Sequence, residues 1–269
     1  MIVARTVAEA RGAIREPRAR GERIGLVPTM GALHGGHLAL LDAARAACDT
    51  VVMSLFVNAA QFEADADLAR YPRDEERDLT TATSAGVDVV FAPSADELYP
   101  AGFDTWVEPG ALAGILEGAS RPGHFRAVAT VCTKLFSIVQ PTVAYFGQKD
   151  AQQVAVIRQV VRDLDLPLEI ETVGTVRDPD GLALSSRNIF LSPAERQAAL
   201  ALPDALRAAA DAHGNGADAI AVARAILDDE PALTVDYVAI ADFGGPTLVA
   251  AIRIGAIRLI DNVRLDGER

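Results

Sequence analysis

Two histidines, His34 and His37, lie three residues apart at the end of a glycine-rich turn. The turn follows a short apolar run, residues 24–27, and leads into a helix-like stretch, residues 38–47, which predicts a strand, a turn and a helix. A helix N-terminus carries unpaired backbone N–H groups and the positive end of the helix dipole, so it favours phosphate. Two imidazoles at this spacing can donate hydrogen bonds to anionic oxygens. The pattern predicts a phosphate-binding site, with a surface pair or half of a metal site as the alternatives.

The glycines of this turn favour the phosphate interpretation. Gly31, Gly35 and Gly36 lack a Cβ atom, so the backbone can approach a ligand closely or adopt positive φ at little cost. A strand, a glycine-rich turn and a helix in succession are typical of phosphate-binding loops.

A second polar cluster, Asn58 and Gln61, follows the apolar run at residues 51–56. Each amide offers a donor and an acceptor, which suits a small hydroxylated or carboxylated substrate. Amides at the end of a strand also commonly cap a helix, and the sequence leaves both interpretations open.

A third cluster, Lys149 and Asp150, follows the apolar run at residues 143–146, and Gln152 and Gln153 begin the next helix-like stretch. Lys149 could meet nucleotide phosphates, while Asp150 could orient a ribose, a metal-bound water or Lys149 itself. An ion pair with only a structural role is the alternative.

Lysine is scarce in this chain. Only two of its 25 basic residues are lysines, Lys134 and Lys149, which indicates that arginine serves wherever any cation is sufficient. A remaining lysine is then a candidate for a place that needs a compact ammonium group. We apply this argument to Lys149, whereas chance retention is the simpler interpretation of Lys134.

A fourth cluster consists of Ser185, Ser186 and Arg187, which follow a turn at residues 177–181. Two hydroxyls beside a guanidinium can form a phosphate clamp, although serines also cap helices. Together with the histidine turn, the cluster indicates a nucleotidyltransferase that holds both ends of a triphosphate while the α-phosphorus is attacked.

The elements that must position these clusters alternate between strand and helix. This alternation favours right-handed βαβ units and a parallel, doubly wound sheet of the α/β class. The predicted strands are residues 24–27, 51–56, 87–91, 143–146 and 168–173, and the predicted helices include residues 125–139 and 151–164. Ligands of such sheets gather at the carboxyl ends of the strands, where the first three clusters lie.

The sequence changes in character after about residue 175. Ser192 before Pro193 predicts an N-cap and a proline at the first helical position, opening a long alanine-rich helix that residues 213–216 end. The elements predicted beyond it are a helix at residues 217–227 and strands at residues 235–241 and 256–260. These elements predict a smaller α+β domain.

Length and composition agree with two globular domains. The chain has 269 residues, half of them hydrophobic, and we predict domains at residues 1–175 and 176–269. Its net charge of -12 argues against a broad nucleic-acid interface and against binding to anionic membranes. No stretch approaches about 18 uninterrupted apolar residues, and the N-terminus lacks the apolar core of a signal peptide.

The two cysteines, Cys48 and Cys132, lie within apolar or helical patterns. They are expected to be small buried side chains rather than a disulfide, which fits a reducing cytoplasm.

Seven motifs along the chain occur in the order seen in one enzyme family. They are PTMGALHGGH at residues 28–37, FVNAAQF at 56–62, YPR at 71–73, RPGHF at 121–125, GQKD at 147–150, DGLALSSRN at 180–188 and RLIDN at 258–262. In their order and spacing the chain resembles the pantothenate synthetases, the pantoate–β-alanine ligases of the nucleotidyltransferase superfamily. The resemblance covers nearly the whole chain.

This resemblance implies a homodimeric cytoplasmic ligase with a Rossmann-like N-terminal domain and a smaller C-terminal lid. Pantoate would attack the α-phosphate of ATP to give pantoyl adenylate and pyrophosphate, and β-alanine would then displace AMP. Mg²⁺ should accompany the ATP, but the sequence does not assign a protein ligand to it.

The resemblance also implies the site residues. His37, His34 and Lys149 would be catalytic, stabilising charge as the α-phosphorus becomes five-coordinate, with His37 at the position usually assigned as proton donor. ATP would be bound by Met30, Gly31, Ala32, Leu33, His34, Gly35, Gly36, His37, Gly147, Gln148, Lys149, Asp150, Val176, Leu184, Ser185, Ser186 and Arg187. Gln61 and Gln153 are similar to the residues that bind pantoate and β-alanine.

Three positions depart from the family pattern. Gly35 stands where glutamate is frequent, the pair at residues 59–60 lacks the usual leading proline, and Ala127 replaces a common glycine. Two rival functions are a plain nucleotidyltransferase, which would not need Gln61 and Gln153, and a nucleotide-binding regulatory protein without catalysis.

Overall fold

The structure is a computed structural model that describes residues 1–62 and 65–267. The chain divides into two compact units, Met1–Phe146 with Val156–Val173, and Gly147–Ala155 with Gly174–Arg269. The change of unit near residue 173 lies close to the domain boundary that the sequence predicts. The short segment Gly147–Ala155, however, groups with the second unit.

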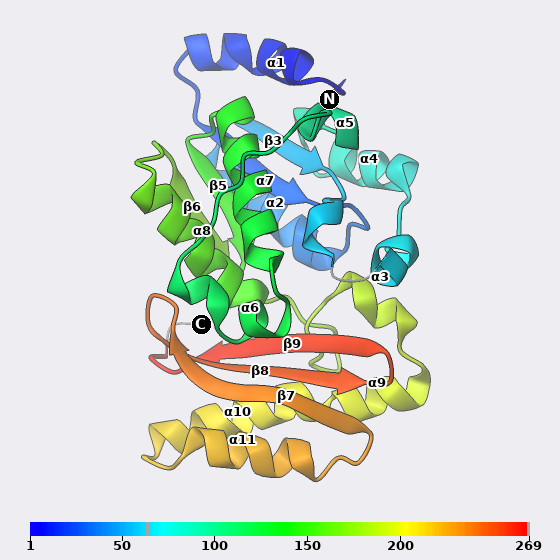
Figure 1. The fold of residues 1–269 in the computed structure, drawn as a ribbon, viewed down its shortest axis with the longest axis vertical. Coiled ribbons are helices and arrows are strands. Elements are labelled where there is room, and N and C mark those ends of the chain that lie inside the picture. The colour runs from blue at the N-terminus through cyan, green and yellow to red at the C-terminus, as the bar shows by residue number, and fades with distance from the viewer. Residues whose placement is uncertain (63–64, 268–269) are drawn as a thin grey trace. The chain divides into compact units, whose positions relative to one another are not determined.

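The first unit is built on a parallel sheet (Figure 1). Its strands are β1 (Ile2–Ala4), β2 (Ile24–Thr29), β3 (Thr50–Leu55), β4 (Val89–Phe91), β5 (Val143–Gly147) and β6 (Glu169–Val173). Its helices are α1 (Val7–Ala19), α2 (Gly35–Ala47), α3 (Asp65–Arg70), α4 (Glu75–Ser84), α5 (Ala95–Leu98), α6 (Glu117–Ser120) and α7 (His124–Val139), with 3₁₀ turns η1 (Ala59–Gln61) and η2 (Ala111–Gly114). Helix α8 (Ala151–Asp163) begins in the second unit and ends in the first.

The strand order, β1-β4-β3-β2-β5-β6, confirms a doubly wound α/β fold. From β2 the chain passes to β3 on one side and later returns to β5 on the other, and both pairings are parallel. The order of the strands therefore reverses at β2. In doubly wound sheets such a switch point opens a crevice at the carboxyl ends of the strands, and β2 is the strand that leads into the histidine turn.

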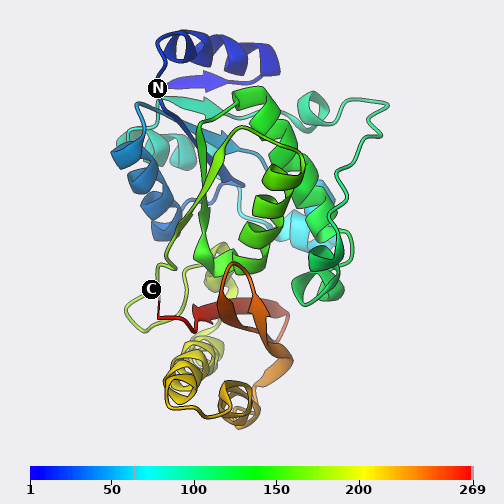
Figure 2. The ribbon, with the colours of Figure 1, turned by 90° about the vertical axis from the view of Figure 1, so that its left-hand side faces the viewer.

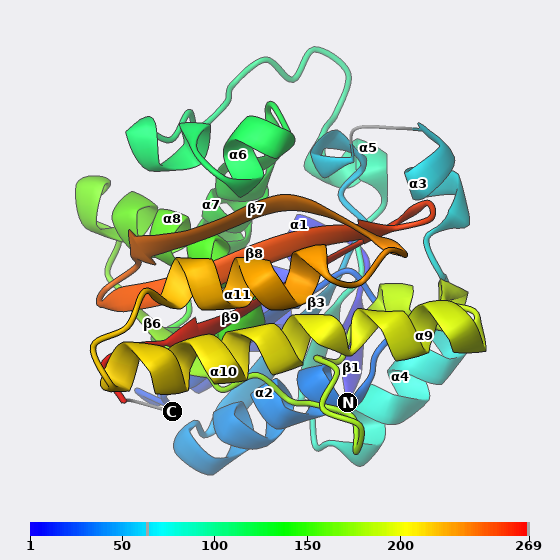
Figure 3. The same cartoon turned by 90° about the horizontal axis from the view of Figure 1, so that it is seen from below.

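Helices cover both faces of this sheet (Figures 2 and 3). On one face Leu41 and Ala44 of α2 pack with Val27, Val51 and Met53 of the strands in one buried cluster. Helix α7 lies on the opposite face, and twelve of its side chains are buried. Burial on both faces explains why these strands are nearly continuous apolar runs.

Strand β1 and the start of α2 are among the differences from the sequence prediction in this unit. Strand β1 was not predicted, because three residues are too few to show a period, and only pairing with β4 defines it. Helix α2 begins at Gly35 rather than at residue 38, so Gly35 and Gly36 are its first residues instead of part of the turn.

The second unit combines a three-stranded antiparallel sheet with helices. Its remaining elements are η3 (Gln148–Asp150), η4 (Ser186–Phe190), α9 (Pro193–Ala199), α10 (Ala201–Gly214), α11 (Ala219–Asp228), β7 (Leu233–Asp242), β8 (Pro246–Ile254) and β9 (Ile257–Arg264). Helices α10 and α11 lie side by side over one face of the sheet (Figures 1 and 3). This arrangement confirms the smaller α+β domain.

Strand β8 was missed by the sequence prediction although it is the central strand. Leu248, Ala250 and Ile252 pack in the cluster formed with α10 and α11, and the intervening Val249 and Ala251 are buried as well. A strand buried on both faces lacks the alternation of polar and apolar residues by which an antiparallel strand is recognised.

The long helix predicted from Pro193 is divided at Leu200 into α9 and α10. Pro203 lies in the first turn of α10, and it has no backbone N–H to bond to the carbonyl of Ala199. A continuous helix would lose that bond, so the chain begins a new helix here. Among the residues described in either unit, no helix is long and apolar enough to cross a membrane.

Candidate active site

The histidine turn ends in a helix cap made by the histidines themselves. His34 is the N-cap of α2, and its Nδ1 accepts a hydrogen bond of 3.1 Å from the backbone N–H of Gly36. His37 Nδ1 accepts one of 3.3 Å from the N–H of His34, and the two ring centroids are 4.2 Å apart. A neutral imidazole that accepts at Nδ1 carries its proton on Nε2. We infer that both rings are donors through Nε2.

This cap changes one detail of the predicted phosphate site. The N–H of Gly36 is used by the His34 ring, so it is not among the unpaired groups at the start of α2. A Cβ atom at residue 36 would lie 2.9 Å from His34 Cε1, which explains why glycine is needed here. The Nε2–H groups of the two imidazoles thus take the place of the Gly36 N–H as hydrogen-bond donors of this turn.

A buried carboxylate holds the turn in shape. Asp78 on α4 is 2% exposed, and its two oxygens accept hydrogen bonds of 2.9 and 2.8 Å from the N–H groups of Ala32 and Leu33. Ala32 has φ +52° and Gly31 has φ +81°, both in the left-handed region. Hydrogen bonds to a charged acceptor are strong enough to stabilise a backbone that alanine otherwise avoids. Asp78 belongs to none of the four polar clusters predicted from the sequence.

Replacing Asp78 by asparagine is expected to lower the free energy of unfolding by about 2 kcal/mol. The amide keeps one acceptor and turns an N–H group toward a backbone donor, so one charge-assisted bond is lost in a buried place. Urea denaturation followed by circular dichroism measures the change.

The matched control is Asp74→Asn at the N-cap of the same helix, where Asp74 accepts from the N–H of Arg77. Asparagine caps helices about as well as aspartate, so this variant should lose only a few tenths of a kcal/mol. Equal denaturation midpoints for the two variants would contradict the role given to Asp78.

Gln61 lies against the histidine turn. Its Nε2 is 3.1 Å from Sδ of Met30, and its Oε1 accepts a hydrogen bond of 3.2 Å from Asn58 Nδ2. Asn58 is buried and also donates to the carbonyl of Ala127. Because a carbonyl oxygen can only accept, the Nδ2 end of the Asn58 amide must face Ala127. The Asn58 side chain makes no cap hydrogen bond to η1, so the capping alternative does not apply to Asn58.

Two residues whose roles the sequence did not predict hold the backbone of Gln61. The carbonyl oxygen of Gln61 accepts from Arg121 Nη2 at 3.1 Å and lies 3.1 Å from His124 Nδ1. Arg121 Nη1 is in turn 3.2 Å from His124 Nε2. Their only signal in the sequence was the RPGHF motif, which carried the resemblance without an assigned role. These contacts fasten Gln61 although the preceding pair, Ala59 and Ala60, lacks a proline.

The lysine cluster belongs to the second unit. Gly147 ends β5, the 3₁₀ turn η3 holds Gln148, Lys149 and Asp150, and α8 follows directly with the half-buried Gln153. Lys149 Nζ is 3.7 Å from Asp150 Oδ1. This distance supports the pairing of Lys149 with Asp150 that the sequence suggested as one of several alternatives.

The other lysine has a visible structural partner. Nζ of Lys134 lies 4.7 Å from the ring centre of Phe103 and 5.7 Å from that of Tyr99, which are cation–π distances. Lys134 is therefore retained beside an aromatic cluster of the first unit. Lys149 remains the lysine to which the argument from scarcity applies.

The serine cluster lies in the second unit as well. Ser185 Oγ accepts from the N–H of Arg187 and caps η4, so this hydroxyl has the capping role that was the alternative to a clamp. The N–H of Leu184 donates to the carbonyl of Val176 at 2.9 Å, beside a bridge between Arg177 and Ala183. Two predicted ATP residues, Val176 and Leu184, are thereby brought together.

Both cysteines are free and buried, in agreement with the sequence prediction. Desolvation raises the pKa of Cys132 to about 12, so this thiol is neutral and unreactive. In the part of the chain that the structure describes, no group of three or more histidine, cysteine, aspartate or glutamate side chains could hold a metal ion.

The first unit alone thus defines a class of protein. It is an α/β protein with a doubly wound sheet whose switch-point strand leads into a donor-rich helix cap, with an amide side chain beside it. Proteins of this class bind anionic ligands at the carboxyl edge of the sheet.

Comparison with known proteins identifies the family. The model of the pantoate-beta-alanine ligase family matches residues 2–264. The pantothenate synthetase of Chloroflexus aggregans is 53% identical over 277 residues, covering 97% of this chain and 99% of that protein. That of Moorella thermoacetica is 51% identical and covers 99% of both chains. The chain therefore belongs to the pantoate–β-alanine ligase family, and it is a ligase of pantothenate biosynthesis.

Solved structures agree with this assignment. The pantothenate synthetase of Thermus thermophilus has a TM-score of 0.94 and 46% identity, covering 98% of this chain and 99% of that one. The pantoate-beta-alanine ligase of Francisella tularensis, a complex with beta-gamma ATP and beta-alanine, has a TM-score of 0.86 and 35% identity, covering 100% and 99%.

Proposed function

We propose that this chain condenses pantoate with β-alanine in two steps through a pantoyl adenylate. A carboxylate oxygen of pantoate attacks the α-phosphorus of ATP, and the bond to pyrophosphate breaks. The amine of β-alanine then attacks the acyl carbon, the bond from that carbon to the phosphate oxygen breaks, and AMP leaves as the amide forms.

The observation that carries the proposal is the contact between Gln61 and Met30. It brings an amide donor, suited to an acid or hydroxyl group, against the turn that presents the two imidazoles. The contact therefore supports an enzyme that brings a small hydroxy acid to a phosphate, as the resemblance implies.

In this proposal the site residues have separate tasks. His34 and His37 donate from Nε2 to phosphate oxygens of ATP, and Lys149 adds a positive charge that stabilises the five-coordinate α-phosphorus. Gln61 and Gln153 bind pantoate. ATP is bound by the remaining residues of the histidine turn, by Gly147–Asp150, and by Val176 with Leu184–Arg187.

Three further features are part of the proposal. Mg²⁺ would accompany the triphosphate and would neutralise part of its charge, and Asp150 would offer it a carboxylate of the type that Mg²⁺ combines with phosphate oxygens. The protein acts as a homodimer, which sedimentation velocity tests directly. It works in the cytoplasm, in agreement with its two free cysteines.

The experiment measures pyrophosphate and AMP after mixing the purified protein with ATP and pantoate. Without β-alanine, we expect one pyrophosphate per active site in the first turnover and no steady release of AMP, because the adenylate waits for the amine. Addition of β-alanine should start steady production of both. Steady AMP production with a phosphorylated acceptor in place of pantoate would instead favour a plain nucleotidyltransferase.

A further inference from the structure

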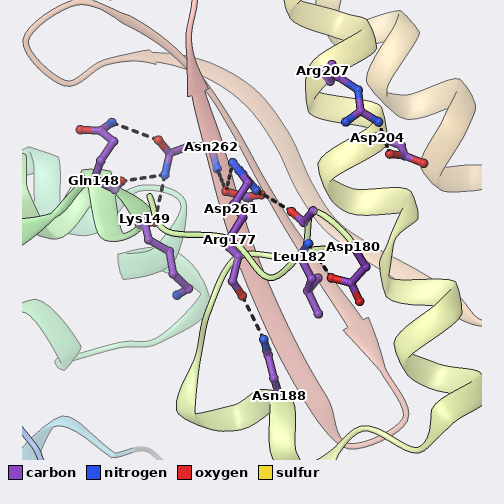
Figure 4. A network of polar contacts seen from close by, with 12 residues as sticks. Gln148, Lys149, Arg177, Asp180, Leu182, Asn188, Asp204, Arg207, Asp261 and Asn262 are labelled. Atoms are coloured by element: carbon purple, nitrogen blue, oxygen red, sulfur yellow. Dashed lines mark hydrogen bonds and ion pairs between the residues drawn. The ribbon is translucent and has the colours of Figure 1, made fainter. Parts of the chain in front are cut away.

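All hydrogen-bonding groups of the Asn262 side chain are used on one short segment. Its Nδ2 donates to the carbonyl oxygens of Gln148 and Lys149, both at 2.9 Å, and its Oδ1 accepts from Gln148 Nε2 at 3.0 Å (Figure 4). Asn262 is 5% exposed, so water does not readily substitute for these bonds. An amide side chain on β9 therefore fastens the turn that carries Lys149.

The chemistry of this contact requires an amide. Two backbone carbonyls can only accept, so the group that faces them must donate twice. The same side chain must also accept from Gln148. Leucine and aspartate are close to asparagine in size but supply no N–H donors, so neither can replace it in this contact.

Strand β9 is itself firmly held. Asn262 pairs with Val249 of the central strand β8. The neighbouring Asp261 is 2% exposed, and its carboxylate binds the guanidinium of Arg177 through both oxygens, with N–O distances of 2.5 and 3.1 Å (Figure 4). The anchor of the Lys149 turn is thus attached to the buried part of the second unit.

This attachment matters because a lysine side chain is flexible. Its four-carbon stem allows many rotamers. Nζ can therefore return to the same place only if the backbone from which the stem starts is fixed. Besides the 3.7 Å approach to Asp150, the carbonyl bond from Asn262 is the contact that ties residue 149 to the sheet.

We propose that Asn262 is a positioning residue that sets the place of Lys149 by holding the carbonyls of Gln148 and Lys149. The proposal rests on the proposed function, in which Lys149 binds the phosphates of ATP. Asn262 itself touches no substrate and acts through the backbone of the turn. A displacement of about 1 Å in a group that stabilises a transition state can cost up to about 100-fold in rate.

The test uses Asn262→Asp and Asn262→Ala. The aspartate has the same shape but replaces Nδ2, which donates to both carbonyls, with a carboxylate oxygen that can only accept. The alanine removes the bonds without adding a charge and so disturbs folding less. Single-turnover release of pyrophosphate should slow about tenfold in both, while the KM for pantoate changes less than twofold.

Lys149 can also be observed directly, because Lys134 and Lys149 are the only lysines of the chain. Acetylation with acetic anhydride, read by mass spectrometry of peptides, reports each of them separately. In the unsubstituted protein ATP should protect Lys149 and leave Lys134 unchanged. In the Asn262 variants the same protection should require at least about tenfold more ATP.

The control is Thr247→Val on the neighbouring strand. Thr247 is fully buried in the same sheet, and its hydroxyl donates to the carbonyl of the half-buried Gly245, so its loss removes a partly buried bond without touching the Lys149 turn. Thermal unfolding identifies a temperature at which all variants are folded. We expect Thr247→Val to keep the rate of pyrophosphate release and the ATP protection of Lys149.

The outcomes are distinguishable. If ATP does not protect Lys149 even in the unsubstituted protein, the proposed function of Lys149 is wrong. If ATP protects Lys149 there and protects it equally in the Asn262 variants, the proposed function stands and the positioning role is overturned. An equal slowing in Thr247→Val would also overturn it, because the effect would then be one of general stability.

Discussion

Replacing Lys149 by alanine should slow formation of the pantoyl adenylate at least about 100-fold while the fold stays intact. An electrostatic contact made to the transition state is commonly worth about 3 kcal/mol, which corresponds to this factor. The ion-pair partner of Lys149 among the described residues is the adjacent Asp150, so no ion pair between distant elements is lost. Single-turnover release of pyrophosphate gives the rate, and circular dichroism checks the fold.

Lys149→Arg should recover little of this rate. A planar guanidinium is larger than an ammonium and directs its donors along a fixed fork, so it does not take the place of a point charge. The matched control is Lys134→Arg, since arginine also stacks on aromatic rings and Lys134 lies over Phe103. This control should keep its turnover. Near-normal turnover in Lys149→Arg would contradict the argument from lysine scarcity.

Alanine at His37 should lower turnover about 100-fold with a much smaller change in either Michaelis constant. A donor that strengthens as charge develops on the phosphates contributes mainly to the transition state. His213→Ala is the control, because this histidine is exposed near the end of α10. Steady-state kinetics with each substrate varied in turn measures both variants. An equal loss in His213→Ala would show that the effect is not specific to the histidine turn.

Alanine at Gln61 should have the opposite signature. The KM for pantoate should rise about tenfold, with much less change for ATP, because in the proposed function the amide binds pantoate in both ground and transition states. Its neighbour Asn58 stays held by the carbonyl of Ala127, so the surrounding structure should persist. If Gln61→Ala weakened ATP and left pantoate untouched, the acid pocket would lie elsewhere.

Local features of this chain were readable from the sequence alone. Strands such as β2 and β3, the helix after the histidine turn and the capped start of α9 follow from periodicity and capping, which involve residues only a few positions apart. The family was equally accessible, because it depends on the order of short motifs and not on their contacts. The histidine turn needed no structure to be recognised as a candidate phosphate site.

Only the tertiary structure decided which distant groups hold the site in place. Asp78 bonds to the backbone of Ala32, 46 residues away, and Asn262 bonds to that of Lys149, 113 residues away. Strand β8 is defined only by its pairing with β7 and β9. A buried donor or acceptor must find a partner, but which one it finds depends on how the elements pack. The sequence therefore determined the chemistry of the candidate site and the elements that carry it. Packing alone determined which distant residues hold the side chains of the site in position.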